Sequence, residues 1–488
     1  MLLFNIDFVC FFHRLSQDVN TEGGYLMRIK SVLFFCLSLF LISCGSSYLF
    51  KIDTYAQQAT LIGKTHKHKG TDFCIVSDKT YFLARVPNSA GNTVEDETAL
   101  YIVDNNGDDE DVILGEFYAS RIAPSHDGNL IVAGNIPSPN NSENDLSFLA
   151  KYDPAGYPIW GKTLKLGDIQ ENMMRVAKYA EGIVSLAVGD DDSIYVVSQI
   201  KEGKNDGPPV YRFWDDFVVA KFDKNGELLW KKKEGSKNTH DQVTAITIDN
   251  GVLYVAGITE GNLYAEHGGN SCETSMSNAR YAAEVAVPCK EIFIASFSTQ
   301  DGSRLKQNQY TGEKIYNEVR SVAVGNGKIA VAGQTGPHAA VHYFSTETFE
   351  HLSTIFFDYT SLRYEEMKKD DEEEKTHYSE VRSIAFDGNN FHVAGVVSED
   401  QGIYYGNEYL ATRSRDMWDV SHVEQYQPRK MFVYKIDGNG GVVDSVFYKL
   451  WFTSPKSPKM IFHEGKRYIL GDLFFWGESK SNFIVIKK

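Results

Sequence analysis

The sequence VTAITIDNGVLYVAGIT, residues 243–259, predicts a β-hairpin against which the rest of the chain can be aligned. β-Branched residues lie on both sides of Asn250-Gly251, a pair that tolerates the positive φ angles of a tight hairpin turn. The same pattern returns as VRSVAVGNGKIAVAGQT at 319–335 and as VRSIAFDGNNFHVAGVV at 381–397. Three copies of one hairpin indicate a repeat protein.

Each hairpin is followed by a third and a fourth strand, so we label the four strands a to d in chain order. The c–d link is clearest in FVVAKFDKNGELLW, 217–230, where Asp223 to Gly226 form the turn. Strands a and b are predicted at 73–86, 120–136, 183–200, 243–259, 319–335, 381–397 and 458–473. Strand c is predicted at 99–104, 146–153, 217–223, 292–298, 339–345, 431–437 and 483–488. Strand d is predicted at 111–118, 158–166, 228–235, 304–312, 351–358 and 441–449.

The last c strand ends the chain without a d strand, and a suitable partner, QATLIGK, stands at 58–64 before the first a strand. We therefore predict an all-β fold, a seven-bladed β-propeller of four-stranded antiparallel blades. An N-terminal outer strand in the last blade would close the ring and leave no blade incomplete.

Glycine ends most of the predicted b strands, which is more typical of close packing or a bulge than of a binding site. The positions are Gly134, Gly257, Gly333, Gly395 and Gly471, with Arg85 and Ser198 departing from the pattern.

A c–d link and the a–b hairpin that follows it together resemble the bacterial seven-bladed β-propeller repeat family. The match is best at 217–259. The shared pattern is F-V-A-K-x-D-x-x-G-x-x-x-W followed by A-I-x-x-D-x-x-G-x-x-Y-V-A-G, and the resemblance covers roughly residues 58–488. It implies the fold and an exported binding scaffold, and it carries no shared catalytic residue.

Residues 27–44, MRIKSVLFFCLSLFLISC, predict an export signal with a basic start and a short apolar core. Its end, Leu41 to Cys44, resembles the lipobox of bacterial lipoproteins, which implies that Cys44 is lipidated and becomes the first mature residue. An ordinary signal peptide ending in a chance cysteine is the alternative. Residues 1–26 precede a second possible start, Met27, and are interpreted as an upstream extension.

These interpretations divide the chain into an extension and lipoprotein signal peptide (1–43), a tether (44–57) and a propeller (58–488). The expected location is outside the cytoplasm, anchored to a membrane by lipid. Aspartate is absent at Gly45 and Ser46, which favours the outer membrane.

The 488-residue chain carries a net charge of −16, which argues against a nucleic-acid partner because such a partner requires a basic face. The expected partner is a protein or glycan of the cell envelope.

The surplus length of the repeats lies in b–c connections (201–216, 260–291, 398–430) and d–a connections (167–182, 359–380). In an up-and-down blade these connections emerge on one face, and the a–b and c–d turns emerge on the other. Since function in such folds usually resides in loops on a rigid scaffold, we predict a binding face there. Tolerated drift is the alternative.

Cys272 and Cys289 lie in the same insertion and predict a disulfide that closes it, with two free thiols as the alternative. Cys74 is interpreted as a small buried core residue.

Carboxylates recur near the starts of the a strands, where a ring of them could bind a cation or a basic partner group. They are Asp72, Glu181, Asp241, Glu318 and Glu380. The competing interpretation, which we favour, makes them acceptors for backbone N–H groups at blade junctions. His66, His240 and His377 follow threonines in d–a connections and indicate structural hydrogen bonds between strands rather than metal ligands.

Asp104 to Asp111 lacks the full pattern of a calcium loop, and KKDDEEEK at 368–375 reads as a charged loop tip. The sequence has no nucleophile elbow, metalloprotease motif, phosphate loop or spaced zinc ligands, so we expect neither a cofactor nor a metal. The leading hypothesis is a non-enzymatic, lipid-anchored binding scaffold. The alternative is a glycan hydrolase or lyase with its site over the central channel.

Overall fold

The computed structural model describes most of the predicted strands and their tight turns. The described residues are 50–54, 57–62, 69–87, 96–104, 109–136, 146–164, 166, 181–205, 211–236, 239–264, 274–278, 283–287, 290–312, 317–336, 338–357, 378–398, 429–452, 459–474 and 481–487. None of the helices within these residues combines the length and apolar character of a membrane span.

Six successive groups of four antiparallel strands form blades 1 to 6, each hydrogen-bonded in the order a, b, c, d. Blades 1 to 3 contain β3 (Lys69–Val76), β4 (Lys79–Pro87), β5 (Asp96–Val103) and β6 (Asp109–Gly115); β7 (Tyr118–Pro124), β8 (Leu130–Ile136), β9 (Leu146–Tyr152) and β10 (Pro158–Leu164); and β11 (Glu181–Val188), β12 (Ile194–Asn205), β13 (Tyr211–Phe222) and β14 (Leu228–Glu234). Blades 4 to 6 contain β15 (Asp241–Asp249), β16 (Val252–Thr259), β19 (Glu291–Ser298) and β20 (Arg304–Tyr310); β21 (Asn317–Gly325), β22 (Lys328–Thr335), β23 (His338–Ser345) and β24 (His351–Phe357); and β25 (Tyr378–Phe386), β26 (Phe391–Ser398), β27 (Arg429–Ile436) and β28 (Val442–Phe452).

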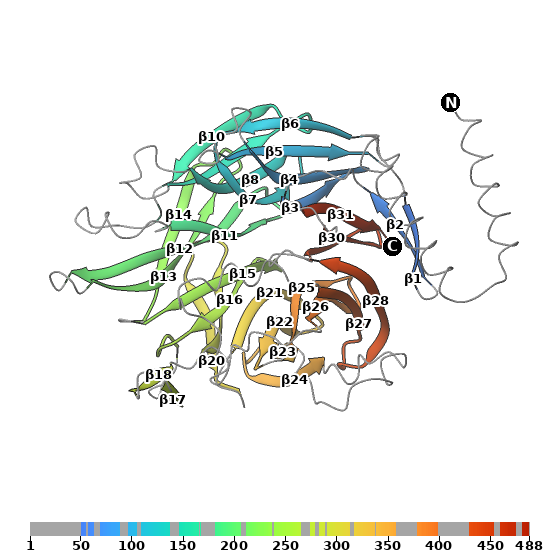
Figure 1. The fold of residues 1–488 in the computed structure, drawn as a ribbon. Helices are drawn as coiled ribbons and strands as arrows, with labels where there is room; N and C mark the ends of the chain where they lie inside the picture. Colours follow the sequence, from blue (N-terminus) through green and yellow to red (C-terminus); the bar gives the residue numbers. More distant parts are fainter. Residues whose placement is uncertain are drawn as a thin grey trace, which may run out of the picture. The chain divides into compact units, whose positions relative to one another are not determined.

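The blades follow one another in chain order (Figure 1), and their innermost strands contact each other in sequence, from β3 and β7 through to β21 and β25. This arrangement of four-stranded antiparallel blades is that of a β-propeller. The all-β prediction and the four-strand repeat are thus confirmed. The hairpin at 243–259 is β15–β16, with Asn250 at φ 48° and Gly251 at φ 73° in its turn.

The remaining strands link the two ends of the chain. β29 (Lys459–His463), β30 (Lys466–Phe474), β31 (Ser481–Lys487) and β2 (Gln57–Ile62) pair in that order, and β1 (Phe50–Thr54) pairs with β2. The β2–β31 pairing is the one that ring closure requires, while the count of seven blades and the closure itself stay predictions. β1 falls inside the range predicted as a tether; its alternation of Phe50, Ile52 and Thr54 with charged residues is a strand pattern that the prediction overlooked.

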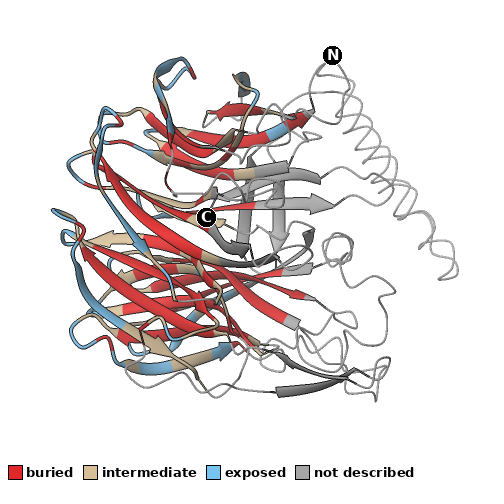
Figure 2. Ribbon diagram, turned by 90° about the vertical axis from the view of Figure 1, so that its left-hand side faces the viewer, coloured by how far each residue is buried: buried red, intermediate tan, exposed pale blue. Residues whose placement is uncertain are grey.

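The hydrophobic core lies between neighbouring blades rather than in one central mass. Leu130 and Val132 pack toward blade 1, whereas the alternating residues Ile131 and Ala133 pack toward blade 3. Because both faces of strands b and c are covered, these strands are continuous apolar runs and not half-polar ones. Buried residues accordingly follow most strands, whereas the exposed residues lie at turns and along outer strands such as β10, β14 and β20 (Figure 2). Cys74 is buried in this core, as predicted, and burial raises the pKa of its thiol.

A bulge at one repeated position shapes every a–b pair of blades 1 to 6. One extra residue in strand a faces a small residue in strand b: Ala84, Gly134, Ser198, Gly257, Gly333 or Gly395. In blade 4 a Cβ on Gly257 would collide with the carbonyl oxygen of Gln242, so the local geometry there favours glycine. The register makes Ala84, not Arg85, the equivalent residue in blade 1, and Gly471 lies beyond the last β29 partner, Leu470.

The a strands are edge strands, and side chains tie their exposed backbone groups to the next blade. Asp72 accepts a hydrogen bond from the Ile122 N–H at 2.9 Å. Serines at the equivalent position of other blades accept from the next a strand at 3.0–3.3 Å: Ser185 from Ile246, Ser321 from Ile384 and Ser383 from Met460. β29 and β3 are joined in a different way, because the Lys459 ammonium group binds the Asp72 carboxylate.

The outer strands are tied to the next blade by a second device. Trp160 in β10 lies over Gly226 in the c–d turn of blade 3 and donates its indole N–H to the Lys224 carbonyl at 3.2 Å. Trp230 lies over Gly302 of blade 4 in the same way. Both glycines have positive φ, and a Cβ on either would collide with the indole ring.

We expect Gly257→Ala to destabilise the fold by about 1–3 kcal/mol, because the added methyl group must displace the Gln242 carbonyl or the Phe293 ring. The matched control is Gly161→Ala, in an exposed d strand where the nearest atom to a new Cβ is 3.9 Å away. Urea unfolding of both variants measures the difference. Equal stability of the two variants would show that the bulge does not depend on glycine.

Candidate functional site

The b–c connection of blade 3 is a paired hairpin extension. Residues 201–216 were predicted as a loop, but the β12–β13 ladder continues through them to the pair Asn205 and Tyr211. The run Tyr211 to Trp214 is rich in aromatic residues, which favour strands. The loop prediction was wrong because it overlooked this signal. The connection therefore projects from the blade as an ordered two-stranded arm.

The b–c connection of blade 4 contains a further hairpin, β17 (Thr274–Asn278) and β18 (Ala283–Val287). Cys272 and Cys289, predicted to form a disulfide around this hairpin, lie outside the described residues, as do Cys44, His66 and His377. The first residues of the connection belong to the blade itself. Tyr264 is buried against Phe293, and its backbone N–H donates to the Gln309 side chain at 3.0 Å.

The five predicted acids occupy three different positions relative to the bulge. Positions are counted from the last paired residue of strand a before the bulge. Glu181 and Asp241 stand two residues before that residue, and Glu318 and Glu380 stand one residue before it. Asp72 is the first paired residue after the bulge. Because side chains alternate along a strand, acids one residue apart point to opposite faces of the blade. Only the backbone of Glu181 is described.

Two of these acids share one arginine. Glu380, which is 0% exposed, forms ion pairs with Arg320 of blade 5 and with Arg382 of its own blade. Arg320 also lies 3.8 Å from Glu318, which Lys290 contacts at 3.2 Å. The result is a chain of alternating charges across blades 4 to 6, in which each described carboxylate has a basic partner.

Asp241, also 0% exposed, joins the strands of blade 4 to the preceding d–a connection. It accepts hydrogen bonds from Thr259 and from the backbone and hydroxyl of Ser236, the latter at 2.7 Å. Asp72 accepts from two backbone N–H groups, those of Phe73 and Ile122. These contacts are of the junction type that the competing interpretation described.

A group of acids lies at the b–c end of blades 3 and 4, of which only Asp241 was predicted from the sequence as a site residue. It consists of Asp215, Asp216, Asp241 and Glu260 together with His240, and we call it the acidic junction. His240 Nδ1 lies 3.0 Å from Asp215 Oδ2, which confirms its predicted structural hydrogen bond. The adjacent acids in Trp214-Asp215-Asp216-Phe217 were a usable signal, since paired carboxylates between aromatic strand residues are unusual.

Burial and like charges perturb this junction. Burial first, and then the charges of Asp241 and Asp215, raise the pKa of Asp216 to about 7. Lys233 lies 3.3 Å from Asp216 Oδ2, but its side chain is 46% exposed, so water screens an attraction that would lower this pKa. The hydrogen bond to Asp215 raises the pKa of His240, and burial raises that of Glu260.

Among the residues that the structure describes, no group of three or more histidines, cysteines or acids is arranged to hold a metal ion. The acidic junction is thus a set of mutually repelling carboxylates, with His240 beside Asp215 and the half-exposed Lys233 beside Asp216. Groups perturbed in this way are more frequent at functional sites than elsewhere, although structural networks also produce them.

Comparisons with known proteins find similar solved structures but no family. A scan against protein-family models finds no match, and neither does a search of the curated proteins. Among solved structures, similar ones include the Dos1 propeller (11% identity, TM-score 0.41, covering 91% of this chain and 81% of that one). The β-propeller domain of the trilobed protease from Pyrococcus furiosus has 11% identity and a TM-score of 0.42, over 86% of this chain and 94% of that one. Hsv2 from Kluyveromyces lactis has 11% identity and a TM-score of 0.38, over 86% and 98%. At such identities the likeness concerns the fold alone.

We expect Asp216→Asn to raise the melting temperature at about pH 8 and to flatten its pH dependence. Because the folded pKa of Asp216 lies above its ordinary value, the folded protein binds the extra proton between about pH 4 and about pH 7, and stability falls as pH rises through that window. The pKa of His240 is also raised in the folded protein, so its contribution to stability is likewise lost as pH rises, at a higher pH. The variant retains this second loss of stability.

The measurement is a series of thermal melts from about pH 5 to about pH 8. Glu227→Gln, which removes an exposed carboxylate from the c–d turn of the same blade, is the control and should follow the wild type. A variant at Asp216 with an unchanged pH profile would contradict the assigned pKa.

Proposed function

We propose that the chain is an exported, lipid-anchored binding scaffold whose b–c/d–a face binds a protein or glycan of the cell envelope. The observation that carries the proposal is the contrast between the two ends of the blades. In the described residues the a–b and c–d connections are tight turns. The b–c end instead carries the extended β12–β13 arm and the inserted β17–β18 hairpin.

The acidic junction supports this choice of face, because it lies between the bases of the two b–c connections. Asp216 belongs to β13 of the arm, and Glu260 follows directly on β16, where the blade 4 connection begins. Its carboxylates repel one another, so a positively charged group of a partner would be attracted there. The partner surface that fits is therefore one that presents basic side chains or amino groups.

One observation favours the alternative of a glycan hydrolase or lyase: a carboxyl group with a pKa near 7, such as that of Asp216, can serve as a general acid. A glycosidase needs a second, ionised carboxylate facing the same cleft at about 5–9.5 Å. Asp215 is adjacent to Asp216 in a strand, so the two side chains point to opposite faces of the sheet. This geometry favours binding over catalysis.

Removing the blade 4 insertion should abolish capture of the envelope partner and leave the fold intact. The deletion is best made from 265 to 289, joined by a short glycine linker, because Tyr264 and Glu291 are buried parts of the blade. The measurement is pull-down from an envelope extract, with a thermal melt to verify folding.

The control changes the opposite end of the same blade, by replacing its c–d turn (298–303) with the blade 3 turn Asp223 to Glu227. That variant should capture the partner like the wild type. Capture that survives the 265–289 deletion would refute the assignment to this insertion.

Replacing Cys44 with serine should release the protein from the membrane fraction, because a lipid chain on that sulfur is the proposed anchor. Fractionation and incorporation of a radiolabelled fatty acid measure the change, and Cys36→Ser, inside the apolar part of the signal, is the control. Membrane association that persists in Cys44→Ser would exclude lipid anchoring at this residue.

A further inference from the structure

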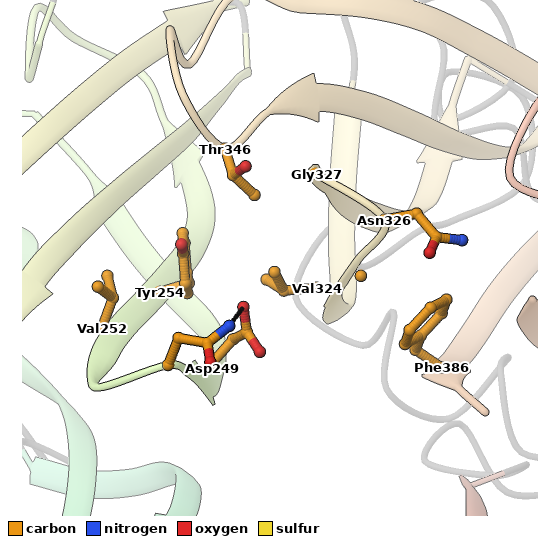
Figure 3. Close-up of a pocket in the computed structure, with 10 residues that line it drawn as sticks. Asp249, Val252, Tyr254, Val324, Asn326, Gly327, Thr346 and Phe386 are labelled. Carbon is orange, nitrogen blue, oxygen red and sulfur yellow. Dashed lines mark hydrogen bonds between the residues drawn. The ribbon is translucent and has the colours of Figure 1, made fainter. Parts of the chain in front are cut away.

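A pocket on the opposite face has no role in the proposal above. It has a volume of about 440 Å³, within the range of about 300–1,000 Å³ that small-molecule sites occupy. Its walls come from the a–b turns of blades 4 and 5, the c–d turn of blade 5 and the end of β25 in blade 6 (Figure 3). All of these elements are rigid parts of the repeat.

The apolar part of the lining is Val252, Val324, Phe386 and the body of Tyr254. Tyr254 is fixed from behind by stacking on Phe349, with ring centroids 6.2 Å apart, and only 7% of it is exposed. Phe386 lies against the backbone of Gly325, where a Cβ would collide with its ring. The apolar wall is thus preformed.

The polar part of the lining consists mainly of acceptors. Asp249 contributes a half-buried carboxylate, and its Oδ2 accepts one hydrogen bond from the Asn250 side chain at 3.0 Å, the dashed line in Figure 3. The side chains of Asn326 and Thr346 also line the space.

Asp249 differs from Asp127 and Asp387, the acids at the a–b turns of blades 2 and 6. Lys151 and Ser125 bind Asp127 in blade 2, and backbone N–H groups and His392 bind Asp387 in blade 6. Within the described part of the chain, Asp249 has no lysine or arginine at ion-pair distance and retains Oδ1 without a hydrogen bond. A carboxylate left open beside an apolar wall is matched by a cation on an apolar stem.

We propose that this pocket binds the ammonium or guanidinium group of a lysine or arginine side chain presented by a partner, with Asp249 as its counter-ion. The aliphatic stem lies along Val252, Val324 and Phe386, and the Asn326 and Thr346 oxygens accept the remaining N–H groups. Tyr254 contributes its hydroxyl group, and the charge of Asp249 helps to raise the pKa of that phenol, after the larger effect of burial.

The test uses the full chain and the peptide acetyl-Gly-Lys-Gly-amide, with its arginine, Nε-acetyllysine and norleucine counterparts as probes, followed by titration calorimetry. The lysine and arginine peptides should bind, and the two uncharged peptides should bind about tenfold more weakly or not at all. Raising the salt concentration from about 50 to about 500 mM should weaken the binding.

Asp249→Asn should weaken binding of the lysine peptide about tenfold, and Tyr254→Phe should weaken it less while keeping the stack on Phe349. Asp78→Asn is the matched control, since it removes the same charge from the equivalent turn of blade 1. Asp216→Asn tests the competing location, because a lysine peptide bound at the acidic junction would lose affinity in that variant and keep it in Asp249→Asn.

The inference is overturned if Asp78→Asn or Asp216→Asn reduces binding as much as Asp249→Asn does, since the peptide then binds elsewhere. It is also overturned if a neutral disaccharide binds in place of the lysine peptide and Asp249→Asn abolishes that binding, which would make the pocket a sugar site. Absence of binding by every probe likewise refutes it. None of these outcomes depends on the envelope partner, which the proposed function assigns to the other face.

Discussion

The hydrogen bonds between the inner edges of neighbouring blades are the constraint on which the rest of the fold depends. An a strand exposes one row of backbone N–H and C=O groups, and unpaired groups of this kind either cost stability or recruit another strand. Here a side-chain oxygen just after the bulge accepts from the next a strand: Asp72 in blade 1, and serine in blades 3, 5 and 6. The bulge places that side chain at the junction, and a small residue stands opposite the bulge: Ala84, Ser198, Gly333 or Gly395.

One junction uses a different chemistry from the others. Serine hydroxyls accept the linking hydrogen bond between blades 3 and 4, between blades 5 and 6, and between blade 6 and β29. The link from β29 to β3 is instead the ion pair of Lys459 with Asp72. These residues are 387 positions apart in the chain, so their contact closes a far longer loop than any junction between consecutive blades. A charge-assisted hydrogen bond is stronger than a neutral one, which suits a contact with a large entropic cost of loop closure. Asp72 also holds Ile122, so one buried carboxylate connects strands on both of its sides.

The sequence predicted the parts of the fold that local chemistry determines. Asn250-Gly251 has the positive φ angles that the hairpin pattern required, and the four-strand repeat holds through blade 6. Register was harder to predict, because a bulge adds a residue without changing the apolar pattern; this is how Arg85 was aligned in place of Ala84. Because of the same one-residue uncertainty, five acids were predicted to form one ring. Asp241 and Glu318 differ by one position relative to the bulge, so their side chains point to opposite faces of their blades. The perturbed Asp216 was missed because its pKa depends on burial and on Asp241, which is distant in sequence.

The two faces differ because their connections form in different ways. On the face that carries the a–b and c–d turns, several carboxylates accept hydrogen bonds within their own turns. Asp153, Asp223 and Asp437 each accept two backbone N–H groups through Oδ1. Those bonds lower the pKa of Asp223 and of Asp437. Asp249 belongs to a tight Asn-Gly turn that closes without help from its carboxylate, so that group stays available. On the face that carries the b–c and d–a connections, the longer connections begin at strand ends where the carboxylates of the acidic junction lie close together. The two acidic sites that we propose are therefore independent, since a change in a turn at one end of a blade leaves the strand register, and hence the opposite face, unaltered.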